Sequence, residues 1–222
     1  MRRSRALAVA ASLALAGSTA DARAQSKGDD QPEFMREPIV ATRRHGFTIG
    51  ITTAPELVSL HGTPTAYADR SAAYELHVGP SLAPMVSGYL GYALADELSF
   101  TVALEPSLYR RDDVKISGTS FEFRIEAFPF THLGGLWPDV GLVGRAGVGS
   151  MRVTRESTGE LLASSGGNSV VGLDVIWDAG RLGHFGVGPT LGVTYRWSET
   201  YAETDVLLGL RVAFYGGKAS AK

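Results

Sequence analysis

Residues 185–197 read FGVGPTLGVTYRW, and this stretch decides the fold class. One parity carries apolar and aromatic residues with Pro189, whereas the other carries only glycine, threonine and Arg196. Successive side chains of an extended strand point to opposite faces, while a helix needs an apolar residue every three to four positions. The stretch therefore predicts a β-strand with two chemically opposite faces.

The same alternation recurs along the chain from His45 onward. The uncharged run 76–95 is long enough for a membrane helix, but Pro80, Pro84 and its three glycines favour a strand. Together the runs predict eight strands at 46–57, 74–94, 97–109, 114–128, 139–152, 169–178, 184–197 and 203–215. We expect the mostly longer connections 58–73, 110–113, 153–168 and 198–202 at one end, and shorter turns at the other.

The composition limits the classes of function. The 222 residues contain 21 Lys and Arg against 23 Asp and Glu, a balance that gives no support for nucleic-acid binding. Without cysteine there can be no disulfide, thiolate metal site or cysteine nucleophile. The five histidines lack metal-ligand spacing, and no nucleotide-binding or hydrolase motif stands between a strand and a helix. We expect no cofactor, no metal site and no enzymatic activity.

The first 24 residues have the pattern of a cleaved secretory signal. Arg2, Arg3 and Arg5 precede an apolar run, and Ala22-Arg23-Ala24 matches a small-residue cleavage site. Residues 25–44 are polar and mixed in charge, and we expect them to form a disordered periplasmic segment. The barrel domain is expected at 45–216, followed by a tail at 217–222.

Charged residues of the predicted strands share the parity opposite the bulky apolar residues. They are sparse, lie between small residues and include almost no lysine, which is untypical of a face exposed to water. We therefore expect a salt-bridge network inside a narrow barrel, because eight strands enclose just enough space for side chains to fill. The predicted network comprises Glu105, Glu122, Arg124, Glu126, Arg145, Asp174, Arg196, Asp205 and Arg211.

Aromatic residues gather near the ends of the predicted strands, as expected of the two belts at membrane interfaces. Trp137, Trp177 and Phe185 are assigned to one belt, and Tyr109, Tyr195 and Trp197 to the other. Pro106 and Pro189 argue against a barrel, because each removes a ladder donor where lipid supplies no substitute. The pattern as a whole predicts an eight-stranded antiparallel up-and-down transmembrane β-barrel.

At this level the sequence resembles the small eight-stranded outer-membrane barrels of Gram-negative bacteria, the OmpA-like transmembrane domain and the OmpX group. The resemblance covers residues 46–215 and includes glycine-rich strands such as 141–149. It implies location in the outer membrane, contact with lipid and lipopolysaccharide, and insertion by the barrel-assembly machinery. Such barrels usually end in an aromatic residue, whereas Phe214-Tyr215 is followed here by seven more residues.

The expected role is structural or interactive, with the loops 58–73 and 153–168 offered to an extracellular partner. Two alternatives stay open. A soluble, lipocalin-like periplasmic barrel would turn the apolar parity inward around a small hydrophobic ligand. A lipid A-modifying enzyme would need a serine and a histidine near the outer leaflet, and His61 with Ser59 or Ser71 are the candidates.

Overall fold

The computed structural model describes residues 44–62, 76–199 and 201–217. The strands of this part are β1 (Gly46–Gly62), β2 (Leu76–Ala95), β3 (Leu98–Arg111), β4 (Val114–Ala127), β5 (Val140–Arg155), β6 (Leu161–Trp177), β7 (Gly180–Leu182), β8 (Phe185–Trp197) and β9 (Tyr201–Tyr215). A 3₁₀ turn, η3 (Trp137–Asp139), precedes β5. No helix of these described ranges is long and apolar enough to cross a membrane.

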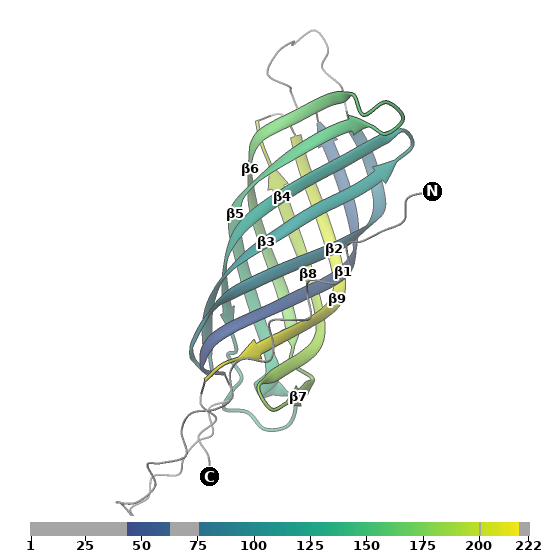
Figure 1. The fold of residues 1–222 in the computed structure, drawn as a ribbon. Coiled ribbons are helices and arrows are strands. Elements are labelled where there is room, and N and C mark those ends of the chain that lie inside the picture. The colour runs from purple at the N-terminus through teal and green to yellow at the C-terminus, as the bar shows by residue number, and fades with distance from the viewer. Residues whose placement is uncertain (1–43, 63–75, 200, 218–222) are drawn as a thin grey trace, which may run out of the picture. The chain divides into compact units, whose positions relative to one another are not determined.

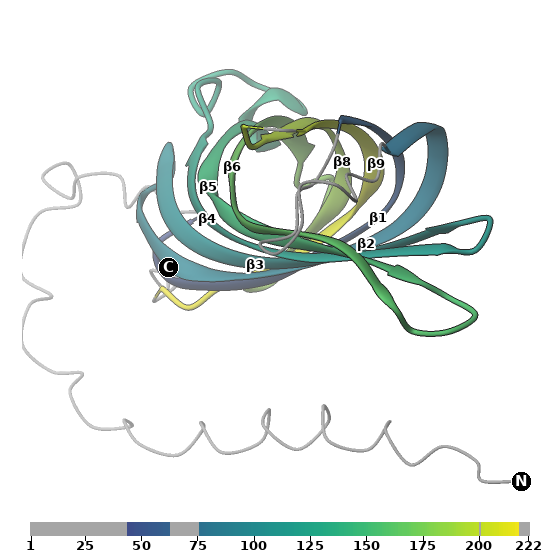
Figure 2. The same ribbon diagram turned by 90° about the horizontal axis from the view of Figure 1, so that it is seen from above.

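The strands form one antiparallel sheet that closes on itself (Figure 1, Figure 2). Closure comes from the pairing of β1 with β9 and of β6 with β8. The short β7 pairs only with β8, so it belongs to the turn after β6 and the wall has eight strands. The predicted eight-stranded antiparallel barrel is confirmed. The predicted signal, residues 25–43 and the tail at 218–222 lie outside the described residues.

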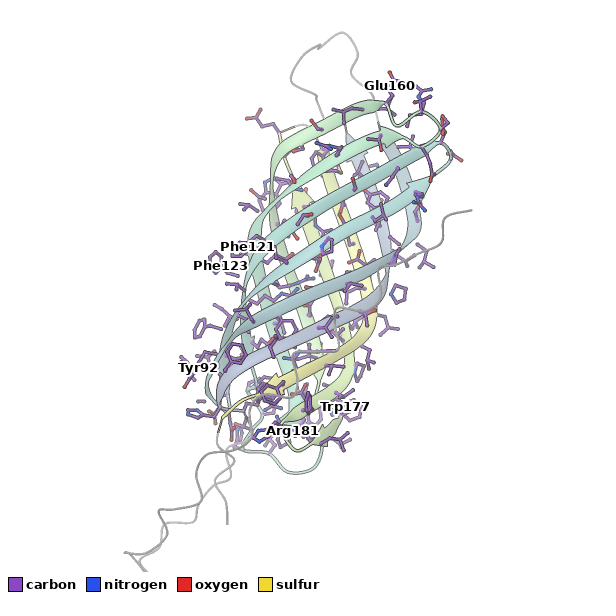
Figure 3. The ribbon with its side chains drawn as sticks, viewed as in Figure 1. Tyr92, Phe121, Phe123, Glu160, Trp177 and Arg181 are labelled. Atoms are coloured by element: carbon purple, nitrogen blue, oxygen red, sulfur yellow. The ribbon has the colours of Figure 1, made fainter. Side chains whose placement is uncertain are left out.

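The barrel buries its polar parity and exposes its apolar parity. On β4, Phe121, Phe123 and Ile125 are 40–63% exposed, whereas Glu122 and Arg124 are at most 5% exposed. Figure 3 shows Phe121 and Phe123 projecting away from the wall. A soluble barrel has the opposite arrangement, whereas an apolar outer band is what a barrel presents to lipid.

The largest differences from the predicted strand boundaries are the earlier start of β6 and the later end of β1. Both lie at the end of the barrel that carries the turns 112–113 and 156–160, which we call the upper end (Figure 1). The predicted loop 153–168 is wrong, because β5 continues to Arg155 and β6 begins at Leu161. Likewise, residues 58–62 extend β1, while 63–73 of that predicted loop lie outside the described residues. The expected contrast between long and short connections is therefore not seen in the described turns.

Above the middle of the barrel, the wall separates into two sheets. The β2–β3 ladder stops at Met85↔Ser107, and the β6–β8 ladder stops at Ser169↔Trp197. The β1–β2 ladder nevertheless continues to Gly62↔Leu76, and the β5–β6 ladder continues to Thr154↔Leu161. Because β8 ends at Trp197, the upper end consists of β1, β2 and the beginning of β9 on one side, facing β3 to β6 on the other.

The prolines stand where ladders are interrupted. Pro84 is the first β2 residue beyond the last β2–β3 pair, and Pro106 lies in a gap of the same ladder. Pro189 lies where β8 leaves β6, after the pair Ile176↔Thr190, and meets β7 at Val187. These interruptions accommodate residues without an N–H donor, so the prolines do not argue against a closed wall.

Candidate functional site

The interior of the barrel holds the charged residues predicted from the sequence. None of the nine is more than 7% exposed. Seven form a cluster in the middle of the barrel, namely Glu105, Glu122, Arg124, Arg145, Asp174, Arg196 and Asp205; Glu126 and Arg211 belong to a second cluster at the lower end. The structure thus brings the predicted residues together in two groups.

Glu105 on β3 is the centre of the middle cluster. Its carboxylate forms ion pairs with Arg124 on β4 (3.5 Å), Arg145 on β5 (3.1 Å) and Arg196 on β8. Because β3, β4 and β5 are neighbours and β8 lies across the barrel from β3, one carboxylate ties together two opposite sides of the wall.

Each arginine in turn reaches several carboxylates. Arg145 pairs with Asp174 (3.0 Å) and Glu122 (3.5 Å) and also donates a hydrogen bond to Thr194. Arg196 pairs with Asp205 and, at 2.8 Å, with Glu203. The planar guanidinium suits this role because its donors form a fork that can serve two acceptors.

The lower cluster surrounds Arg211 on β9. This side chain lies 2.7 Å from a carboxylate oxygen of both Glu126 and Asp178. The Tyr215 hydroxyl donates to Asp178 at 3.1 Å, and the Ser99 hydroxyl donates to Glu126.

Arg44 completes the lower cluster, so the predicted disordered segment 25–44 is wrong at this residue, the one position of the segment that the structure describes. Its side chain is fully buried, lies 3.4 Å from the centre of the Phe128 ring and pairs with Asp178 (3.2 Å) and Asp139 (3.0 Å). Its backbone N–H donates to Asp96 at 2.6 Å. Arg44, two residues before β1, is therefore bound to all three lower turns.

Asp178 follows β6 and lies in the lower turn. Burial opposes ionisation of this carboxyl, but the guanidinium groups of Arg211, Arg44 and Arg181 outweigh burial and hold its pKa below the ordinary value. The neighbouring positive charges therefore stabilise the ionised form of Asp178.

Four interior charges were not predicted, namely Arg44, Glu56, Asp178 and Glu203. Glu203 and Asp205 share one parity, and Glu56 shares the inward parity of β1, so alternation could have identified both. Asp178 ends the predicted strand 169–178 on the parity of Asp174, so alternation could have identified it as well, although the observed β6 ends at Trp177. Arg44 lies outside the strands, where alternation carries no information. Within the described ranges no group of His, Asp and Glu has the arrangement of a metal site.

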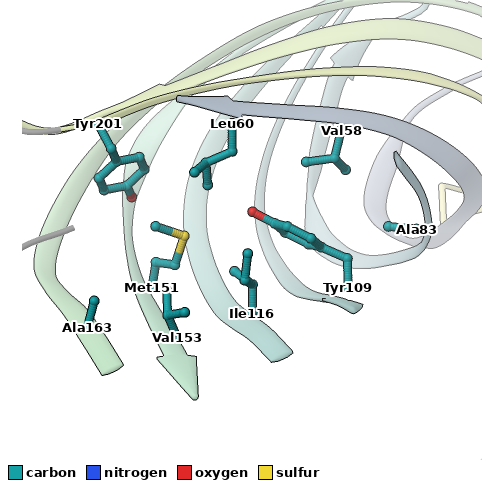
Figure 4. Packing of buried hydrophobic residues seen from close by; sticks show 9 residues of the cluster. All are labelled: Val58, Leu60, Ala83, Tyr109, Ile116, Met151, Val153, Ala163 and Tyr201. Carbon is teal, nitrogen blue, oxygen red and sulfur yellow. The ribbon is translucent and has the colours of Figure 1, made fainter. Parts of the chain in front are cut away.

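Above the ion pairs, the interior becomes apolar. The two upper sheets contact each other through nine buried side chains (Figure 4): Val58, Leu60, Ala83, Tyr109, Ile116, Met151, Val153, Ala163 and Tyr201. The assignment of Tyr109 to an outer aromatic belt is therefore wrong. Its side chain is 3% exposed, and its hydroxyl donates to Glu203 at 3.0 Å.

The other predicted belt residues lie on the outside. Trp137 and Phe185 are 55% and 47% exposed at the lower end, and Trp177 is half-buried beside them. Tyr195 and Trp197 stack on each other near the upper end, with ring centres 5.5 Å apart. Their exposure fits the amphipathic side chains that occupy membrane interfaces.

The upper turns are held to each other by polar contacts. Ser157 donates to the Asp113 carboxylate from its hydroxyl (2.7 Å) and from its backbone N–H (2.8 Å). These two bonds hold the pKa of Asp113 below its ordinary value. Arg110 and Glu156 form an exposed ion pair between the same two hairpins. The β3–β4 and β5–β6 tips thus form one connected surface.

Ser59 and His61, the candidates for lipid A chemistry, lie on the outer face of β1. The Ser59 hydroxyl lies 3.3 Å from Nε2 of His61, and the contact is exposed. Ser71 lies outside the described residues.

Comparisons with known proteins found solved structures to which this chain is similar at low sequence identity. The solved structures that it is similar to include Ail, the attachment invasion locus protein of Yersinia pestis (12% identity, TM-score 0.47, 76% of this chain and 99% of that chain). Neisserial surface protein A (15%, 0.48, 75% and 96%) and OprG from Pseudomonas aeruginosa (10%, 0.41, 80% and 100%) are further examples. No family model and no curated protein matches the sequence.

Proposed function

We propose that this protein is an outer-membrane barrel with a closed interior, whose role is to hold a recognition surface outside the cell. The filled interior is the observation that carries the proposal. Two ion clusters and an apolar cluster follow one another along the axis, and their members are nearly all buried. A water-filled channel needs an open path, and side chains can fill an eight-stranded barrel completely.

In this proposal, the signal at 1–24 directs export, the barrel-assembly machinery inserts the chain, and lipid and lipopolysaccharide surround the apolar band. The protein has no enzymatic activity, and its extracellular partner contacts the upper end. We assign the contact surface to the joined tips at 112–113 and 156–160, in place of the expected loop 153–168. Of the other expected loop, 58–73, residues 58–62 belong to β1.

Conductance tests whether the barrel is closed. The purified protein in planar lipid bilayers should give no stable current steps, while a general porin inserted under the same conditions should give them. Stable conductance by the wild-type barrel would contradict a filled interior.

Labelling of an introduced cysteine on intact cells tests the orientation of the barrel in the membrane. Because the chain has no native cysteine, only the introduced thiol of this protein can react. A Thr158→Cys protein should react with a membrane-impermeant maleimide on intact cells. A Leu182→Cys protein, altered at an exposed residue of the lower end, should react only after permeabilisation. The reverse pattern would place the termini outside and reject the proposed recognition surface.

The Ser59–His61 contact favours a second candidate, hydrolysis of an acyl chain of lipid A. A hydroxyl within hydrogen-bond distance of an imidazole can lose its proton to that ring as it attacks an ester. If this function holds, expression should remove an acyl chain from lipid A in mass spectra, and Ser59→Ala or His61→Ala should restore it. Identical lipid A with and without the wild-type protein would exclude it.

A further inference from the structure

The outer face of β4, β5 and β6 changes character in rows. A row here is a set of residues that lie opposite one another on the three strands. The lowest row contains Phe123, Ala146 and Val171, and the row above it contains Phe121, Val148 and Ser169. Above these come Thr119 opposite Ser150, then Ser117 opposite Arg152 and Ser164, and finally Lys115 opposite Thr154. The surface thus passes from apolar to hydroxyl-bearing to basic towards the upper end.

A groove of about 400 Å³ lies on the hydroxyl rows. Its lining residues are Ser117, Gly118, Thr119, Ser150, Met151, Arg152, Ser164, Ser165 and Gly166. A bulge shapes it, because the β5–β6 ladder passes from Gly149↔Asn168 to Met151↔Ser165 and leaves Ser150 opposite two glycines. The groove is largely open to solvent.

One cation in the groove and one beside it have no acidic partner among the described residues. Within the ranges that the structure describes, neither Arg152 nor Lys115 forms an ion pair, whereas the neighbouring Arg155 pairs with Glu160 at 3.4 Å. Arg152 is exposed in the groove, and Lys115 lies on the adjacent row. An arginine among hydroxyls is suited to bind an anionic oxygen group attached to a sugar, because it offers charge-assisted hydrogen bonds beside weaker polar contacts.

The position of the groove indicates where that ligand comes from. Ser117 lies about 13 Å along β4 from Phe121, at roughly 3.3 Å per residue. The row of Phe121 continues through Val148 and Ser169 to the belt residue Trp197. Ligand groups at this height lie just above the apolar band, where the headgroups of a membrane begin.

We propose that this groove binds the phosphorylated sugar headgroup of a glycolipid in the outer leaflet, with Arg152 and Lys115 contacting phosphate and the serine and threonine hydroxyls contacting the sugar. The proposal rests on the membrane orientation given under the proposed function, but not on a closed interior or on a recognition role.

The test uses the folded full-length barrel in phosphatidylcholine nanodiscs, with diphosphorylated lipid A as the probe and native mass spectrometry as the measurement. The double variant R152Q/K115Q should bind lipid A about tenfold more weakly than the wild type. The matched control R155Q, which removes a neighbouring exposed charge, should stay within about twofold. Ser150→Asp should also weaken binding, because it places a negative charge in the groove.

Two further ligands show whether the groove recognises the phosphate groups and whether it requires a lipid. The wild type should bind lipid A without phosphates as weakly as the double variant binds diphosphorylated lipid A. It should bind soluble glucose 1,6-bisphosphate far more weakly than diphosphorylated lipid A. Equal binding of the wild type and the double variant would overturn the site. Equal affinity for the soluble phosphosugar would overturn the glycolipid assignment. Neither result depends on conductance, so failure here is distinguishable from failure of the closed-barrel proposal.

Discussion

At the scale of single residues, the interior depends on arginines that each neutralise more than one carboxylate. Arg145 alone contacts Glu105, Glu122 and Asp174. Removing one partner from a buried ion pair is strongly destabilising because the other charge is left in a poorly solvated site. The interior should therefore be more sensitive to single substitutions than an exposed ion pair is.

Arg145→Leu is expected to lower the free energy of unfolding by about 3–5 kcal/mol. Arg155→Leu, which breaks only the exposed pair with Glu160, should cost at most about 1 kcal/mol. Urea unfolding in detergent micelles, followed by tryptophan fluorescence, measures both. Equal stability of the Arg145→Leu and wild-type barrels would mean that the buried ion pairs contribute little.

The lowered pKa of Asp178 predicts how the stability of the fold changes with pH. Because its pKa is lower in the folded barrel, its ionised form stabilises the fold above the unfolded value of about 3.8, and this contribution is lost as pH falls through the folded value. The Asp178→Asn barrel should be less stable than the wild type at pH 7, and the difference should shrink below about pH 4. A difference that is constant with pH would show that Asp178 is not ionised in the barrel.

At the scale of elements, the upper end combines two sheets around an apolar cluster, as in a small sandwich. Leu60 lies fully buried in that cluster, whereas Leu104 is 57% exposed on the outer band. The same truncation should therefore have different costs at the two positions. A cavity forms inside the cluster, whereas lipid tails can fill the space left on the outer face.

Leu60→Ala is expected to cost about 2–5 kcal/mol. It should also speed amide hydrogen exchange in the upper parts of β1, β5 and β6 while leaving their lower parts protected. Leu104→Ala should cost less and leave that exchange unchanged. If both variants behave alike, the upper cluster does not act as a packed core.

The differences between the predicted and the observed structure concern the extent and the register of the strands. Alternation has a period of two and is a local property, so it assigned inward and outward residues on most strands. It could not identify residues 161–168, because Ser164, Ser165, Gly166 and Gly167 have the composition of a turn, and only pairing with β5 makes them a strand. The partners of each arginine depend on strand register around the barrel, which the sequence alone did not reveal.

At the scale of the whole molecule, the apolar outer band requires a lipid or detergent environment. The protein should be recovered with the outer-membrane fraction and, unboiled, should run faster on gels than the boiled form, because a closed barrel stays folded in detergent. Recovery in the soluble periplasm would contradict this and favour the alternative of a lipocalin-like carrier.

The separation of the upper wall into two sheets also has a mechanical consequence. A force that draws the tips at 112–113 and 156–160 away from the β8–β9 turn meets no continuous ladder above Ser169. Side-chain packing and the hydrogen bond from Asn168 to Tyr201 resist it there. The two sides would separate down to the pairs Met85↔Ser107 and Ser169↔Trp197. Below these pairs, backbone hydrogen bonds close the wall. A pulling force on these tips would thus separate the upper strands while the closed ring below them stayed intact.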